Sequence, residues 1–268
     1  MRDYQTMKKY KIDRSKNIGN VIFVVEGGRA DTGGTELRLL KNIFCNILGY
    51  EVQELRRDCD EFIAHGSNPQ FRVFALNLPK PQLTQMTDDA LDELYSRLNR
   101  EFNVKPEDCP IFFLYDRDVG SYKLKEFKPY VYNYTDPYGD ENGNQGQLLL
   151  SYPCIESYLL SCVDNDVYQQ SCRLGKELKP IIKDHGISEA CINTEAHLIH
   201  ATVEMDKGLD NFSLGAYDLD HLADTLTELY KAQQQKYKTD ETFSLLSLVS
   251  MALLELGIII EDEAEDDT

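Results

Sequence analysis

The sequence has no long apolar run and no segment that resembles an export signal. Its longest apolar segments are 111–115 and 245–260, and polar residues and Gly257 interrupt the second one. A membrane-spanning helix needs about 20 apolar residues, so we expect none. Residues 1–16 are charged and lack the apolar core of a secretory signal. The sequence therefore predicts a cytoplasmic protein.

Cysteine motifs for zinc and glycine motifs for nucleotides are also missing. The seven cysteines are an odd set and none of them is spaced as CxxC, so we expect neither a disulfide framework nor a structural zinc site. Only His197 and His200 lie close together, without a Cys or carboxylate at zinc-finger spacing. Neither GxxxxGK[ST] nor GxGxxG occurs, so the sequence predicts no nucleotide-binding P-loop.

A positive net charge is missing as well, because 46 acidic against 28 basic residues give −18. This charge repels polyanions and excludes a protein that coats nucleic acid non-specifically. It does not exclude an enzyme that acts on phosphates, because bound divalent cations reverse the local sign of a carboxylate site. Residues 1–16 carry six bases, whereas 261–268 carry six acids and no base. We interpret the acidic end as a solvated tail, with a docking or autoinhibitory segment as the alternative.

Strand-like and helix-like segments alternate in the first part of the chain. Apolar, β-branched and aromatic residues at 20–28, 71–79 and 109–119 predict three buried strands. Apolar residues at helical spacing follow the first strand, over 35–48, and recur over 88–102. This alternation predicts an α/β fold with a mostly parallel sheet flanked by helices.

Helical periodicity dominates the second part of the chain. Segment 148–163 predicts a further short strand and then a helix, with Pro153 at the helix start. We therefore expect an α/β domain over 1–165 and an α-helical C-terminal region with an acidic tail over 166–268. The helical patterns of that region cover 166–183, 194–206, 218–236 and 241–259.

Three acidic residues directly follow two of the predicted strands. Glu26 comes after VIFVV, and Asp116 and Asp118 come after IFFLY. Ligands bind at the carboxyl ends of parallel strands, so we expect these acids to lie together. Carboxylates at the edge of an apolar core repel one another unless a cation neutralises them, and oxygen ligands of this kind suit Mg²⁺ or Mn²⁺. The DxD spacing puts Asp116 and Asp118 on one face, and Arg117 on the other as a structural ion pair or a phosphate contact.

These motifs resemble the Toprim domain of topoisomerases, primases and OLD-type nucleases, which has a glutamate after one hydrophobic strand and a DxD after a later one. The similarity is closest to the bacterial defence branch, with RloB-like proteins and the Toprim effector of the PARIS anti-phage system. In that branch a Thr-Glu pair starts the next helix and a Pro-Cys-Φ-Glu segment follows the DxD. Here they are Thr35-Glu36 and Pro153-Cys154-Ile155-Glu156, and the resemblance covers residues 20–163.

The resemblance implies a Mg²⁺-dependent endonuclease that acts as a toxic effector. Such effectors cleave tRNA, the favoured substrate here, or DNA, and an ABC-type ATPase partner holds them inactive until a phage trigger releases them. In this sequence Asp116 and Asp118 would bind the metal ion, with Glu26 as a further ligand or as the general base. Glu36 and Glu156 would complete a second metal position or orient the ligands. Glu26 and Glu36 are ten positions apart, which departs from the plain Toprim pattern.

Simpler interpretations of these residues stay open. Arg117, Lys123 and Lys125 are candidates to stabilise charge on a bound phosphate, but solvated surface charges are the simpler interpretation of the two lysines. Glu36 and Glu156 each fit an acid at a helix N-terminus, where the helix dipole favours negative charge.

Two other functions also remain. A DxD after an apolar strand occurs in metal-dependent glycosyltransferases, where it binds a nucleotide-sugar diphosphate and where Glu26 would not be needed. A non-catalytic binding subunit would keep a Toprim-like shell and use its acidic surface only for docking.

Apolar helical faces in the C-terminal region predict an interface. Leu222, Leu226, Leu229 and Tyr230, and later residues within 245–256, form faces wider than a small helical region can bury. We expect a homodimer through these faces in the active state, because most soluble oligomers are twofold symmetric. The acidic exterior would dock on a basic surface of the ATPase.

Overall fold

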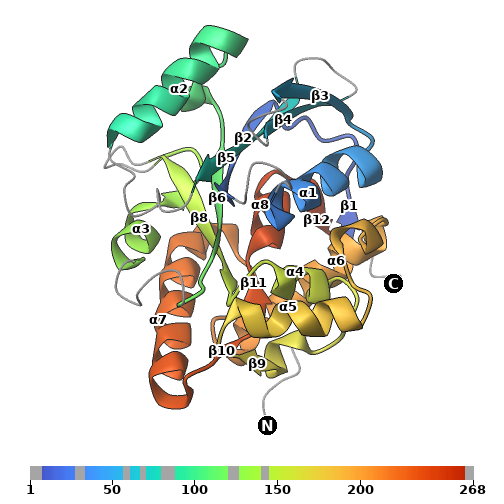
Figure 1. The fold of residues 1–268 in the computed structure, drawn as a ribbon, viewed down its shortest axis with the longest axis vertical. Coiled ribbons are helices and arrows are strands. Elements are labelled where there is room, and N and C mark those ends of the chain that lie inside the picture. Colours follow the sequence, from blue (N-terminus) through green and yellow to red (C-terminus); the bar gives the residue numbers. More distant parts are fainter. Residues whose placement is uncertain are drawn as a thin grey trace, which may run out of the picture.

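A mixed β-sheet organises the part of the chain that the computed structural model describes, which is residues 8–27, 34–56, 61–66, 71–79, 88–119, 127–139 and 145–262. Eight strands of these residues form the sheet, and helices pack against it (Figure 1). Its four central strands run parallel, in the order β8-β6-β2-β5. Their bounds are β2 (Asn20–Gly27), β5 (Arg72–Pro79), β6 (Ile111–Asp116) and β8 (Gly146–Tyr152).

Burial explains the apolar sequences of these central strands. Every residue of β6 and of β8 is buried. Strands that are covered on both faces give continuous apolar runs instead of an alternating pattern. The strands predicted within 20–28, 71–79 and 109–119 are confirmed as β2, β5 and β6. The parallel arrangement predicted for the sheet is confirmed at its centre.

Antiparallel strands extend both edges of the sheet, which the sequence did not indicate. β3 (Glu51–Arg56) pairs with β4 (Glu61–His65), and β4 pairs with β5. At the other edge, β7 (Thr135–Asp136) and β11 (Leu246–Ser247) both pair with β8. The sheet is therefore mixed, with its parallel strands confined to the centre.

Helices lie where most of the helical patterns predict them. α1 (Thr35–Lys41) contacts β2, β4 and β5 and continues into a π-helical turn, η1 (Asn42–Ile47). α2 has the predicted bounds, Asp88–Phe102. The other α-helices are α3 (Lys128–Asn133), α4 (Glu156–Ser161), α5 (Gly175–Asp184), α6 (Glu195–Asn211), α7 (Leu222–Asp240) and α8 (Val249–Glu255). Short 3-10 turns are η3 (Pro106–Asp108), η4 (Val167–Gln169), η5 (Glu189–Cys191) and η6 (Leu219–His221).

The sequence predicts an α-helical region after residue 165, but the described part of this region also contains strands. It contains four short strands, which are too short to leave a periodic pattern. β11 lies in the main sheet, and buried side chains before and after residue 165 belong to one hydrophobic core. The strands other than β11 are β9 (Ser171–Cys172), β10 (Phe243–Ser244) and β12 (Ile259–Glu261).

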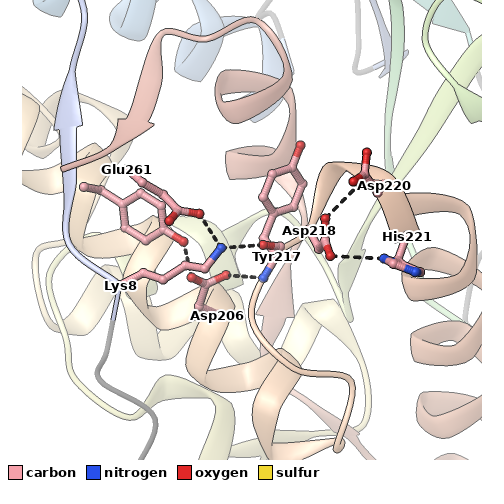
Figure 2. Close-up of polar contacts among 8 residues, drawn as sticks. Lys8, Asp206, Tyr217, Asp218, Asp220, His221 and Glu261 are labelled. Carbon is pink, nitrogen blue, oxygen red and sulfur yellow. Dashed lines mark hydrogen bonds and ion pairs between the residues drawn. The ribbon is translucent and has the colours of Figure 1, made fainter. Parts of the chain in front are cut away.

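The two ends of the described chain lie side by side. β1 (Tyr10–Ile12) pairs antiparallel with β12. Figure 2 shows the Lys8 ammonium against Glu261 and against the Tyr217 carbonyl, the latter at 2.9 Å. The Tyr10 hydroxyl donates a hydrogen bond to the Asp206 carboxylate. Residues 8–12 are thereby held against residues 259–262.

The apolar faces that suggest a homodimer are buried within the single chain. Leu226, Leu229, Leu248 and Leu253 are all 3% exposed or less. α8 packs on β8 and on α6, and α7 packs on α3 and β7. These faces give no reason for a homodimer, and dimerisation remains an untested prediction. None of the described helices has the length and hydropathy needed to cross a bilayer.

Candidate active site

Two acidic residues leave the sheet at the same edge. Glu26 is the penultimate residue of β2, and Asp116 is the last residue of β6. The two strands are parallel neighbours, with Val25 in register with Leu114. The chain positions of Glu26 and Asp116 are therefore adjacent, as the sequence predicts. The Glu26 side chain lies outside what the structure describes.

Asp116 is fixed by the segment that follows the neighbouring strand. The residue is 9% exposed, and its Oδ1 atom accepts a hydrogen bond from the Ile155 backbone N–H at 2.7 Å. Ile155 belongs to the Pro-Cys-Ile-Glu segment between β8 and α4. This hydrogen bond brings the beginning of α4, and with it Glu156, to the DxD motif.

Glu156 is buried beside a lysine that the sequence did not single out. It is 7% exposed, and its Oε1 atom lies 3.6 Å from Lys179 Nζ. Its other carboxylate oxygen, Oε2, has no hydrogen-bond partner among the described residues. A buried acceptor without a partner is destabilising, so this oxygen is suited to receive a cation or a donor from a ligand.

Lys179, on α5, lies within the field of three of the predicted acids. Burial alone would lower the pKa of its ammonium, but the charges of Glu156, Asp116 and Glu36 outweigh burial and raise it. Glu36 lies in the first turn of α1 and is itself 7% exposed. The structure therefore places Lys179 3.6 Å from Glu156 and close enough to Asp116 and Glu36 to be affected by their charges. Lys179 is an exposed lysine on an amphipathic helix, and nothing in the sequence distinguishes it from its neighbours.

Asp118 faces the first turn of α5. A Cβ atom added to Gly175 would lie 2.9 Å from Cys154 Cβ, 3.0 Å from Cys154 Sγ and 3.6 Å from Asp118 Oδ2. Gly175 thus lets α5 approach both residues closely. Burial, together with the charges of Glu156 and Asp116, raises the pKa of the Cys154 thiol. Cys154 therefore stays protonated at neutral pH and is not a thiolate nucleophile.

Arg117 does not lie in this site. Its backbone N–H donates to the Ser151 carbonyl at 2.8 Å, so the chain is still paired to β8 there and the side chain points opposite to Asp116. The residue is 0% exposed and its guanidinium packs against the rings of Phe127, Tyr230 and Phe243. The burial contradicts the predicted phosphate contact, because a guanidinium enclosed by aromatic rings cannot reach a substrate. Lys123 and Lys125 lie outside the described residues.

The chemistry of this site is that of oxygen ligands beside an ammonium. Carboxylates of this number suit Mg²⁺ or Mn²⁺, and the unpartnered Glu156 oxygen fits such an ion. Among the described side chains, however, no three His, Cys, Asp or Glu groups converge closely enough to hold a metal ion. The Glu26 side chain is not among these described groups. The chain matches no model of a known protein family, no curated protein and no solved structure.

Proposed function

We propose that the protein is a Mg²⁺- or Mn²⁺-dependent nuclease with its active site at the carboxyl edge of β2 and β6. One observation carries the proposal: the Lys179 ammonium lies 3.6 Å from Glu156 and within electrostatic range of Asp116 and Glu36. Acidic residues alone at this edge would indicate a cation site but would give no group for binding phosphate. An ammonium among them also gives the site a charge that can bind phosphate.

Each residue has a role in this proposal. Asp116 and Asp118 would hold the metal ion, with Glu26 as a further ligand or as the base that takes a proton from water. A bound Mg²⁺ would supply a Lewis acid for the phosphate oxygens. Glu36 and Glu156 would orient this set, and Lys179 would bind a phosphate oxygen.

The wider role follows from the Toprim resemblance. We propose a Toprim-like nuclease of the cytoplasm that serves as the toxic effector of an anti-phage system, cleaving RNA, with tRNA favoured, or DNA. An ABC-type ATPase partner would hold it inactive, and the active form would be a homodimer. The parallel strands β2 and β6 with acids at their ends support the Toprim-like fold.

A non-catalytic binding subunit is the second candidate, and one observation favours it. Lys179 already places a positive charge 3.6 Å from Glu156, so part of the acidic charge is neutralised without a metal ion. In such a protein the same groups would only stabilise the fold.

Cleavage by matched variants separates these candidates. Purified protein is incubated with end-labelled tRNA and duplex DNA in Mg²⁺ or Mn²⁺. We expect Lys179→Met to lose at least about tenfold in rate, the minimum for loss of one charged contact worth about 1.4 kcal/mol to the transition state. Lys183→Met, one turn later on α5 and also exposed, should cut like wild type.

Calorimetric titration with Mn²⁺ completes the test. We expect wild type to bind Mn²⁺, and Asp116→Asn and Glu26→Gln to lose both Mn²⁺ binding and cleavage. A wild type that neither binds Mn²⁺ nor cuts would establish the binding subunit instead. A wild type that binds Mn²⁺ through Asp116 but not Glu26, and cuts neither nucleic acid, would favour a DxD glycosyltransferase.

A further inference from the structure

A short helix after the DxD motif carries an exposed tyrosine between two lysines. Tyr132, on α3, is 39% exposed. Its ring centroid lies 5.7 Å from Lys128 Nζ and 5.7 Å from Lys231 Nζ. Lys128 starts α3, whereas Lys231 belongs to α7, which lies against α3 (Figure 1). We call these three residues the α3–α7 patch.

The charge of the patch contrasts with that of the molecule. The whole chain carries −18, yet two ammonium groups here flank one exposed ring. Lys231 also pairs with Glu228 at 2.5 Å, whereas Lys128 has no ion pair with an acidic side chain in the described part of the chain. A polyanion can approach an acidic protein only where such local positive charge exists.

Arg117 connects the patch to the acidic site. Its guanidinium lies 4.9 Å from the ring of Phe127, the residue just before α3, and 6.0 Å from the ring of Tyr230, the residue just before Lys231. Arg117 itself separates Asp116 from Asp118. One buried side chain therefore holds both helices of the patch next to the DxD motif.

We propose that the α3–α7 patch binds a single-stranded stretch of nucleic acid, with a base stacked on Tyr132 and phosphates on Lys128 and Lys231. This inference rests on the proposed nuclease function and names the form of substrate that the site receives. Exposed aromatic rings beside basic side chains bind single strands, because every unpaired base offers a flat face for stacking. A duplex keeps its bases stacked inside, so Tyr132 has nothing to stack on.

Binding is measured by the fluorescence anisotropy of a short fluorescein-labelled single-stranded RNA, with the duplex of the same sequence and a single-stranded DNA as further arms. EDTA is present, so that binding is scored without cleavage. We expect Tyr132→Ala to weaken binding of the single strand about tenfold, and Tyr132→Phe, which keeps the ring, to bind nearly as wild type does. Lys128→Ala should weaken binding and reduce the slope of log affinity against log salt by about 0.7.

Two variants serve as controls. Tyr138→Ala removes a tyrosine that is 60% exposed after β7, and Lys105→Ala removes an exposed lysine that precedes the amino end of β6, whereas the DxD motif lies at its carboxyl end. Both should bind as wild type does. Equal affinity for single-stranded RNA and DNA would support binding by base stacking that does not depend on the sugar. A preference for one of them would identify the type of substrate.

Several results overturn the inference. They are a wild type that binds no single strand, patch variants that bind like wild type, or controls that lose as much as the patch variants. Duplex binding that is as tight and as dependent on Tyr132 also contradicts it. A protein that binds through the patch but never cuts would refute the nuclease function and leave the patch in place.

Discussion

A fully buried guanidinium separates the two aspartates of the DxD motif. Besides its three aromatic neighbours, Arg117 has Nε and Nη2 at 3.0 Å from the side-chain oxygen of Gln234, in the amide orientation that satisfies both groups. Burial lowers the pKa of this guanidinium, and nearby tyrosines partly offset the shift. Burying this cation costs desolvation energy. We infer that Arg117 has a structural role, because its guanidinium packs α3 and α7 against the sheet.

Arg117→Ala should therefore destabilise the protein strongly. The substitution leaves a cavity between aromatic rings and removes the partner of the buried Gln234 amide, so we expect the free energy of unfolding to fall by about 3 kcal/mol. Arg173→Ala, at an exposed ion pair with Glu241, is the control and should leave the free energy of unfolding nearly unchanged. Urea denaturation measures both. An Arg117→Ala protein as stable as the control variant would contradict the structural role of Arg117.

Glu255 predicts a pH dependence of stability. Burial raises its pKa to about 7, although a hydrogen bond from Gln147 opposes the shift and the Asp136 charge adds to it. The folded state thus favours the protonated acid. Its contribution is fully present below the unfolded pKa, near 4.5, and is lost as pH rises through about 7.

The expected consequence is a loss of about 3 kcal/mol in unfolding free energy between pH 4.5 and pH 8 from this residue. Glu255→Gln keeps the oxygen that accepts from Gln147 and removes the titration. Its unfolding free energy should therefore exceed that of wild type at pH 8 and match it near pH 4.5. Equal pH profiles for both proteins would show that Glu255 titrates normally.

At the scale of elements, the position of α5 determines where Lys179 lies. α5 begins at Gly175, which lies close to Cys154 and Asp118. It also packs against α4, the helix that follows β8. The ammonium of Lys179 reaches Glu156 only because the first turn of α5 is this close. Anything that moves α5 outward separates the lysine from the acids.

Gly175→Ala tests this packing, and the sign of the result is informative. Helix propensity alone predicts that alanine stabilises α5 by up to about 1 kcal/mol. The added Cβ would lie 2.9 Å from Cys154 Cβ, so we expect destabilisation by about 1–2 kcal/mol instead. Thermal unfolding in EDTA measures the change, with Lys176→Ala on the next residue as the control. Stabilisation would show that α5 has room to shift.

The helices and strands differ in how well the sequence predicts them. Central strands and α2 were predictable because their apolar periods are long and unbroken. Segment 241–259 was predicted as one helix, but it forms β10, β11, α8 and part of β12. A short, continuous apolar run does not distinguish a buried helix from buried strands. Lys179 was beyond reach for a different reason, because only the packing of α5 on α4 makes it a neighbour of the acids.

For the whole molecule, the question is how a chain of charge −18 holds a polyanion. Residues 1–16 carry six basic residues and are one candidate for this positive charge. In the structure, Lys8 pairs with Glu261 and Lys11 pairs with Asp262 at 2.7 Å. These lysines already face the acidic end of the chain. Positive charge for a substrate is therefore expected at Lys179 and at the α3–α7 patch instead.

Metal-dependent cleavage tests the proposed nuclease most directly. End-labelled tRNA and duplex DNA are incubated with purified wild type and with Asp116→Asn, each in Mg²⁺ or Mn²⁺ and again in excess EDTA. Wild type should produce new ends only with the metal ion, and Asp116→Asn should produce none, because it removes one charge from the ligand set and keeps an oxygen for the Ile155 N–H. Cutting that persists in EDTA or in Asp116→Asn would contradict the proposed site, and so would a wild type that cuts neither substrate with either metal.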